Sequence, residues 1–402
     1  MRMGGRLAGA DFMRALACLL VLVHHLVLRL DFNAVSDGIR PMFELARFGN
    51  YGVSIFFVLS GFLLARPFWT ALDNKQSLPP LKAYGLRRAA RVLPGFWIAL
   101  TAGFVLSFTV YDFPLNSERV GRYLAGFFLM SQWHWRTFFP VDGDGPLWSI
   151  PFEATCYVLL PLCFVLLSRF PGALGPGGRR IVFLMVAMTA LFGHWLIVSQ
   201  IQMDELARGW NFGMQGGAKE WMPRFNPIGF FVIFAIGALA AGIHTMLPER
   251  RSIIFDVVAL MALTSGAMQF FRSVGGTWEG YGWLGIPYRF PLLPMAVGAA
   301  LCALPRSEFL GDALDNRVVR LIATISFGIY IWQDIVLSMM VKVVPGSFGV
   351  GSADALSGWI VSSLMATILI LLAATASYTF LERPVVRRAG SLEKSRWLPA
   401  AR

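Results

Sequence analysis

The chain has 402 residues, of which 56% are hydrophobic and only 14% are charged, and its mean hydropathy is +0.61. This composition is too apolar for a soluble domain of that length, so it excludes an ordinary soluble protein and predicts a polytopic membrane protein. The formal net charge of +12 would suit a nucleic-acid partner, but basic residues in membrane proteins usually set the orientation of the chain.

Ten segments are apolar over the roughly 20 residues that a transmembrane helix needs. The predicted fold is therefore all-α, a polytopic bundle of about ten transmembrane helices. In chain order the segments are 11–30, 49–66, 92–111, 150–168, 181–201, 226–246, 253–271, 285–304, 320–343 and 357–380. The apolar run at 120–130 is too short to cross, so we expect a short interfacial or re-entrant helix there, or a distorted eleventh span.

Basic residues are distributed unevenly between alternate loops. With the N-terminus inside, 22 of the 35 Lys and Arg residues lie in cytoplasmic segments. This bias follows the positive-inside rule, so we expect both termini to be cytoplasmic in a multi-pass protein of the inner, cytoplasmic membrane. It also removes the argument for nucleic-acid binding.

The chain is interpreted as one integral-membrane domain at 1–385 followed by a short basic cytoplasmic tail at 386–402. Glu382 and Arg383 are expected to form a boundary pair, and Pro384 is expected to stop the last helix. The four cysteines all lie in apolar stretches without the spacing of metal ligands, so we predict neither a disulfide framework nor a metal site.

The first span carries Arg14 near its start and the adjacent pair His24 and His25 past its middle. Eleven steps of about 100° return to nearly the same helical face, and a rise of 1.5 Å per residue places Arg14 and His25 roughly 16 Å apart. Ionisable groups at that depth usually face a bundle interior or a water-filled cavity, although a histidine can also simply bond a neighbouring helix. We assign function to His25 and packing to His24, which points elsewhere.

The next polar features flank the second span. Ser60 belongs to a set of small residues that suit either close helix packing or the approach of a ligand. Arg87, Arg88 and Arg91 precede Pro94, and Arg87 and Arg91 share a helical face. This arginine cluster fits either a positive-inside stop with an interfacial helix or a cytoplasmic clamp for phosphate groups.

Two later spans also contain polar residues. Glu153 lies near the outer end of the fourth span, where a carboxylate can cap the first helical turn, but Trp148 and Ser149 add an indole and a hydroxyl close by. The run "ISFGIYIWQD" places Gln333 and Asp334 inside an apolar segment. We interpret Asp334 as a satisfied polar core contact.

Taken in this order, these residues resemble the integral-membrane acyltransferase 3 family, whose members include O-acetyltransferases of surface polysaccharides, peptidoglycan and oligosaccharide signals and acyltransferases of macrolide sugars. Arg14 and His25 match the family's arginine, ten residues, histidine signature. The family's "GVxxFFxxSGFL", "RRxxRxxP" and "PLWSLxxExxFY" are matched by "GVSIFFVLSGFL", "RRAARVLP" and "PLWSIPFEATCY". One departure is Gln333, which stands where many relatives carry a histidine and indicates a subgroup with a different acceptor.

The resemblance implies a cytoplasmic acyl-CoA donor, most often acetyl-CoA, and an acceptor hydroxyl on a carbohydrate or glycolipid. No permanently bound cofactor is implied. Because histidine has a pKa near the operating pH, His25 is the predicted general base, oriented by Glu153; attack by His25 to give an acyl-imidazole is a second route. The predicted donor-phosphate ligands are Arg14, Arg87, Arg88 and Arg91. The predicted contacts to the thioester or acceptor are Ser60, Trp148, Ser149, Tyr330 and Gln333.

A transporter or flippase of a lipid-linked sugar is the competing interpretation, because polar residues inside spans also mark substrate paths. A scaffold would give no reason for Arg14 and His25 to share a face. Within the enzyme interpretation, the acceptor is a surface or exported polysaccharide, with an oligosaccharide signal or a macrolide sugar as alternatives.

Overall fold

The computed structural model describes residues 7–169, 175–200, 218, 221–277, 279–349 and 355–397. Over these ranges the chain forms helices and no strand, which confirms the predicted all-α fold. The α-helices are α1 (Ala10–Val27), α2 (Arg40–Arg47), α3 (Gly52–Asp73), α4 (Leu81–Thr109), α5 (Ser117–Phe127), α6 (Ser149–Ser168), α7 (Pro176–Gln200), α8 (Pro227–Met246), α9 (Ile253–Phe271), α10 (Leu292–Ala303), α11 (Leu310–Leu314), α12 (Arg317–Val343), α13 (Ala355–Ser377) and α14 (Arg383–Trp397).

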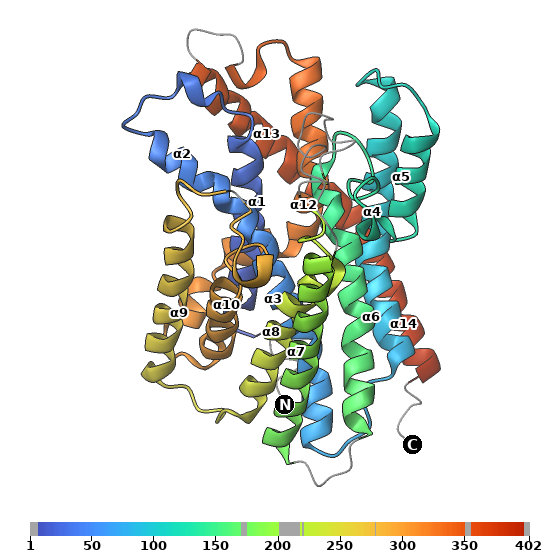
Figure 1. The fold of residues 1–402 in the computed structure, drawn as a ribbon, viewed down its shortest axis with the longest axis vertical. Coiled ribbons are helices and arrows are strands. Elements are labelled where there is room, and N and C mark those ends of the chain that lie inside the picture. The colour runs from blue at the N-terminus through green and yellow to red at the C-terminus, as the bar shows by residue number, and fades with distance from the viewer. Residues whose placement is uncertain are drawn as a thin grey trace.

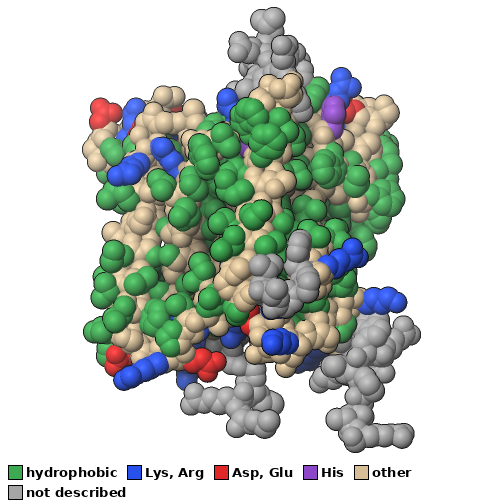
Figure 2. Space-filling model, turned by 60° about the horizontal axis from the view of Figure 1, so that its bottom comes forward, with side chains coloured by type: hydrophobic (Ala, Val, Ile, Leu, Met, Phe, Trp, Pro, Cys, Tyr) green, Lys and Arg blue, Asp and Glu red, His purple; other side chains and the backbone are tan. Residues whose placement is uncertain are grey.

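The helices form an elongated bundle in which α1 begins and α14 ends toward the same end, lower in Figure 1. We call this the lower end and the opposite one the upper end. Large apolar side chains lie exposed on the outer helices, and in Figure 2 they cover most of the face shown, while charged side chains gather toward its rims. This distribution is that of a multi-pass membrane protein.

Nine helical segments in the described part of the chain are long and apolar enough to cross a membrane. They account for nine of the ten predicted spans. The tenth prediction, 285–304, contains α10, which has 12 residues and continues only as the 3₁₀ turn Leu304–Arg306. Its helix begins late because Pro287 and Pro291 disfavour helix in the residues before Leu292.

The apolar run at 120–130 lies mostly in α5, a helix of 11 residues at the upper end beside α4. At 1.5 Å per residue it is too short to be an eleventh span. Two of its arginines bond one carboxylate: Arg119 Nε lies 3.0 Å and Arg122 Nη1 2.9 Å from the oxygens of Asp142. This buried cluster fixes the segment between α5 and α6, which later forms part of the site.

We expected the last helix to stop at Pro384, but it continues beyond this residue. A π-helical segment, Tyr378–Glu382, joins α13 to α14, and the helix continues to Trp397. Proline is tolerated in the first turn of a helix, and a π-segment accommodates the lost backbone hydrogen bond. Glu382 is buried and faces Arg91 of α4, with 3.6 Å between Oε2 and Nη1, so it does not pair with Arg383 at a boundary.

The centre of the bundle is the close packing of α3 against α8. A Cβ atom added at Gly61 would lie 2.1 Å from the carbonyl oxygen of Phe234, and one at Gly237 would lie 1.9 Å from that of Val58. Gly61 of the second span therefore serves close backbone contact with α8. The helix α1 packs between α3 and α12, which places its polar face inside the bundle.

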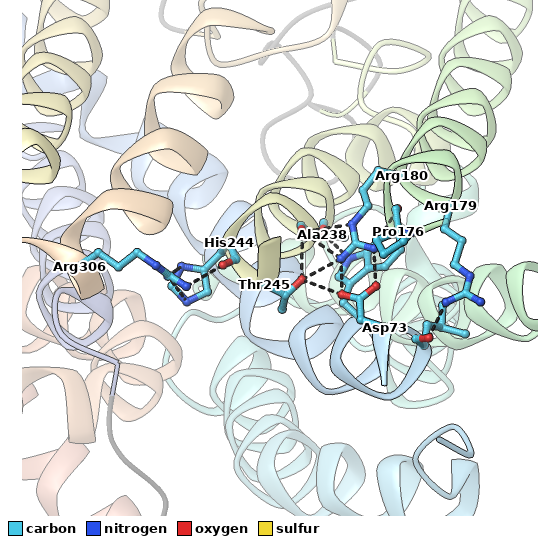
Figure 3. Close-up of polar contacts among 11 residues, drawn as sticks. Asp73, Pro176, Arg179, Arg180, Ala238, His244, Thr245 and Arg306 are labelled. Atoms are coloured by element: carbon cyan, nitrogen blue, oxygen red, sulfur yellow. Dashed lines mark hydrogen bonds and ion pairs between the residues drawn. The ribbon is translucent and has the colours of Figure 1, made fainter. Parts of the chain in front are cut away.

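The lower end is tied together by an ion pair between α3 and α7 (Figure 3). Arg180 donates to both carboxylate oxygens of Asp73 and to the Gly242 carbonyl and Thr245 hydroxyl of α8. Its guanidinium also lies 4.4 Å from the centre of the Trp69 ring. One buried side chain thus links three helices.

We predict that Arg180→Gln lowers the apparent unfolding midpoint of the purified protein by at least a few degrees. The substitution leaves the partly buried carboxylate of Asp73 without its cation, which costs about 2 kcal/mol or more. Thermal unfolding at a fixed heating rate measures the effect. Arg251→Gln is the control, because the Arg251 and Asp312 pair is about half exposed and contributes little. Equal midpoints for the two variants would contradict the prediction.

Candidate functional site

Two cavities lie along the inner face of α1, one toward each end of the bundle. The upper cavity has a volume of about 290 Å³ and the lower about 120 Å³. His25 lines the upper cavity and Arg14 the lower one, as their shared helical face predicts. Val53 of α3 and Tyr330 of α12 line both cavities, so the two meet at these side chains.

His25 has one ring nitrogen held by its own helix. Its Nδ1 lies 2.8 Å from the carbonyl oxygen of Val21, one turn earlier. A carbonyl can only accept a hydrogen bond, so Nδ1 carries the proton and Nε2 of the neutral ring keeps a free lone pair. Glu153, the predicted orienting residue, lines the lower cavity, whereas the backbone of Val21 holds the His25 ring.

His24 points toward a different neighbour. Its ring is buried, and its Nδ1 bonds the carbonyl oxygen of Arg47 at the end of α2. The two histidine rings meet edge to face, with 5.0 Å between their centres. His24 also borders the upper cavity, but its bond to α2 is the packing contact that the sequence predicts for it.

Next to His25, an ion pair crosses from α1 to α12. Arg29 Nη2 lies 2.9 Å from Oδ1 of Asp334 and 3.1 Å from the hydroxyl of Ser338. The other carboxylate oxygen of Asp334 accepts the backbone N–H of Gly145 at 2.8 Å. Asp334 is thus a satisfied polar contact, as predicted, yet it also lines the upper cavity with Arg29. Sequence reasoning missed Arg29, although it lies one helical turn after His25.

The lower cavity combines three arginines with one carboxylate. Arg14, Arg88 and Arg91 line it together with Glu153. Oε1 of Glu153 accepts hydrogen bonds from the hydroxyl of Ser60 at 2.7 Å and from that of Tyr157 at 2.5 Å. Of the residues assigned to the donor phosphates, Arg87 is the one that does not line this cavity. The three guanidinium groups at the cavity fit an anionic ligand.

Two bonded hydroxyls line the lower cavity, and one of them, that of Tyr330, also belongs to a side chain that lines the upper cavity. Tyr330 and Ser149 share a hydrogen bond of 2.5 Å, and the Tyr330 hydroxyl donates to the carbonyl oxygen of Pro146 at 3.0 Å. Both side chains are buried. Because the Tyr330 proton goes to Pro146, Ser149 is the donor in the bond that the two hydroxyls share.

The remaining predicted contacts differ in their surroundings. Trp148 lines the upper cavity and stacks on Phe138, with 5.1 Å between the ring centres. Gln333 is fully buried, its amide donates to the Tyr330 carbonyl at 3.2 Å, and it borders neither cavity. Its predicted contact with a substrate stays a prediction.

Sequence reasoning also missed the far wall of the upper cavity. Glu279 and Tyr288 come from the segment between α9 and α10, and Trp221 and Phe225 come from the segment before α8. The sequence signal for this wall is the run "WEGYGW" at 278–283, which is rich in aromatic residues and glycine. A loop that only connects two helices does not need so many aromatic side chains. Among the described residues, no cluster of three or more His, Cys, Asp or Glu could hold a metal.

A buried acid lies behind the wall of the upper cavity. Asp144 is fully buried, and neither of its carboxylate oxygens has a hydrogen-bond partner. Burial raises the pKa of Asp144 well above its usual range, and the nearby carboxylate of Asp334 raises it further. Asp144 therefore keeps its proton at pH values where an exposed aspartate has lost it.

We predict that Asp144→Asn becomes increasingly stabilising, relative to the wild type, as the pH rises above about 4. Above that pH the unfolded chain releases the Asp144 proton while the folded chain retains it, so the wild type loses stability with rising pH until the raised pKa is passed. The asparagine variant lacks this loss. Apparent unfolding midpoints across a pH series measure it, with the exposed Asp37→Asn as control. A constant difference at every pH would contradict the prediction.

Comparison with known proteins places the chain among membrane acyltransferases. The sequence profile described as an acyltransferase domain matches residues 7–380. YrhL of Bacillus subtilis, which carries the name of a peptidoglycan O-acetyltransferase, is 26% identical over 94% of this chain and 54% of its own. The peptidoglycan O-acetyltransferase OatA of Listeria monocytogenes is 22% identical over 83% of this chain and 50% of its own.

A third relative, the acyltransferase MdmB of Streptomyces mycarofaciens, is 26% identical over 41% of each chain. The chain thus spans about half the length of the two peptidoglycan relatives that it matches. No solved structure matches it.

Proposed function

The chain belongs to the acyltransferase family whose profile covers it, and from this premise we propose that it transfers an acyl group, most often acetyl, from acyl-CoA to a hydroxyl of a carbohydrate. The observation that carries the proposal is the pair of cavities on one face of α1. One presents an imidazole with a free Nε2, the other presents three arginines, and they meet at Tyr330. This arrangement suits two substrates that approach from opposite ends.

The residues at the meeting point suit direct acyl transfer. A sugar hydroxyl is a poor nucleophile, so Nε2 of His25 removes its proton as the oxygen attacks the thioester carbonyl. Tyr330 and Ser149 line the lower cavity, and a hydroxyl that rotates away from its protein partner can donate to the negative oxygen that develops. When the carbon–sulfur bond breaks, the proton on His25 passes to the thiolate. Attack by Nε2 itself, giving an acyl-imidazole, is a second route through the same residue.

The lower cavity suits the donor. Guanidinium groups match phosphate oxygens, and Arg14, Arg88 and Arg91 all border this cavity. A volume of about 120 Å³ holds the thioester and a few further atoms of the pantetheine arm, but not the whole of CoA. Arg14 and Arg91 are 31% and 30% exposed, so phosphates outside the cavity can still reach their guanidinium groups. We therefore place the phosphates at the arginines and the thioester at Tyr330. This proposal assigns the lower end to the cytoplasm of the inner membrane, where acyl-CoA is made.

The upper cavity suits the acceptor. An envelope polysaccharide is the acceptor that we propose, because two relatives are named for the O-acetylation of peptidoglycan. An oligosaccharide signal or a macrolide sugar would need the same chemistry at His25. A lipid-linked sugar transporter would move its cargo without consuming acyl-CoA, and this difference separates the two classes of function.

We predict that His25→Ala lowers acyl transfer at least about 100-fold, because it removes the general base. The measurement is release of CoA thiol and acylation of a glycan acceptor by the protein in liposomes loaded with acetyl-CoA. His134→Ala is the control, since His134 is exposed near the upper end. Full activity of His25→Ala together with loss of activity in His24→Ala would show that the base is misassigned.

We predict that Arg88→Gln and Arg91→Gln each raise the KM for acetyl-CoA about tenfold or more, because each removes a charged hydrogen-bond donor from the donor cavity. The KM for the acceptor should change much less. Lys82→Gln is the matched control, because Lys82 is an exposed cation on the same helix. If Lys82→Gln raised the KM equally, general surface charge and not a defined site would attract the donor.

A further inference from the structure

We propose that the upper cavity is a binding site for a single pyranose ring, in which Glu279 accepts hydrogen bonds from the ring hydroxyls and selects the acceptor. This inference rests on the proposed function, since it names the group that is brought to His25. Glu279 and His25 line the same cavity although they lie far apart in the sequence.

Glu279 is buried, which is unusual for a carboxylate. Its side chain is only 7% exposed, and its Oε1 accepts a hydrogen bond from the Trp221 indole at 3.2 Å. Glutamate is rarely buried to this degree, because removing a carboxylate from water is costly. A carboxylate accepts at about four positions, so it can bond protein donors and ligand hydroxyls at the same time.

Backbone hydrogen bonds hold Glu279 and Gly280 in place. The backbone N–H of Tyr288 donates to the carbonyl of Glu279 at 2.9 Å, and that of Arg289 donates to the carbonyl of Gly280 at 2.7 Å. Gly280 has a φ of +53°, and a Cβ atom there would lie 1.8 Å from the Tyr51 hydroxyl. The Tyr51 hydroxyl in turn bonds Ser273 at 2.8 Å. A connecting loop braced in this way holds its carboxylate in a fixed position, as a binding site requires.

The rest of the wall suits a sugar ring. Trp148, Trp221, Phe225 and Tyr288 line the cavity and pack against one another, with 5.9 Å between the two indole rings and 6.0 Å between the rings of Phe225 and Tyr288. A pyranose ring has C–H faces that pack on aromatic rings and hydroxyls around its edge that need hydrogen-bond partners. Aromatic walls with a few fixed polar groups provide both.

The size of the cavity sets the size of the ligand. A volume of about 290 Å³ lies at the lower limit for small-molecule sites, so it fits one sugar unit and not an oligosaccharide. Glu279 stands on the segment between α9 and α10, and Arg29 and His25 stand on α1. A ring held by Glu279 and the aromatic wall can therefore present one hydroxyl to His25.

The variant Glu279→Gln separates a role in sugar binding from a purely structural role. Glu279→Gln keeps an oxygen for the Trp221 indole and nearly the same shape, but it loses the negative charge and one acceptor oxygen. A residue that only braces the loop would tolerate the change. Glu118→Gln is the matched control, because Glu118 is exposed on α5 at the same end.

The first experiment measures acetyl transfer to methyl N-acetyl-β-D-glucosaminide. We expect Glu279→Gln to raise the KM for this acceptor about tenfold or more, with a much smaller change in kcat and in the KM for acetyl-CoA. Cyclohexanol, which has one hydroxyl and no others to hold, should be acylated with the same KM by both proteins. An unchanged sugar KM in Glu279→Gln, with activity abolished in His25→Ala, would overturn the inference and leave the proposed function standing.

The second experiment requires no donor. Binding of the same glycoside to the protein in nanodiscs is followed by tryptophan fluorescence, since Trp148 and Trp221 line the cavity. We expect the wild type and Glu118→Gln to bind the glycoside and Glu279→Gln to bind it about tenfold more weakly. This result without any consumption of acetyl-CoA would support the sugar site and defeat the proposed transfer. Equal binding by all three proteins, or none by the wild type, would overturn the inference.

Discussion

The arrangement of the site depends on the ion pair between Arg29 and Asp334. The pair joins α1 to α12, and the same carboxylate accepts the backbone N–H of Gly145, where the chain turns into α6. Removing one partner would leave a largely buried charge unpaired, which costs more than the pair itself contributes. One carboxylate therefore fixes three separate parts of the chain against each other.

The contacts of the Asp334 carboxylate also set the positions of the reacting groups along the bundle. His25 precedes Arg29 by four residues, Tyr330 precedes Asp334 by four, and Ser149 follows Gly145 by four. Each of these groups therefore lies a short stretch of chain from a residue that the shared carboxylate holds. The imidazole lines the upper cavity, Ser149 lines the lower one, and Tyr330 lines both.

The features that could be predicted from the sequence are those that depend on the geometry of a single helix. Period and hydropathy suffice for the spans and for the common face of Arg14 and His25, since both follow from local geometry. Contacts between distant segments were not predictable: the ion pair of Asp334 and the position of the Glu279 carboxylate depend on how helices rotate and pack. The arginine cluster shows the limit, because the cavity takes Arg88 and Arg91, three apart, and not Arg87, which is spaced equally well from Arg91.

Hydrolysis of the thioester competes with acyl transfer, and the shape of the two cavities affects this competition. On the proposed function, the thioester waits at Tyr330, where the nearest polar groups already bond each other and Pro146. Water that enters from above must cross the upper cavity, one wall of which is aromatic. A sugar that fills this wall excludes that water and supplies the hydroxyl at the same time. Productive transfer is thus favoured over hydrolysis by the shape of the acceptor cavity as much as by His25.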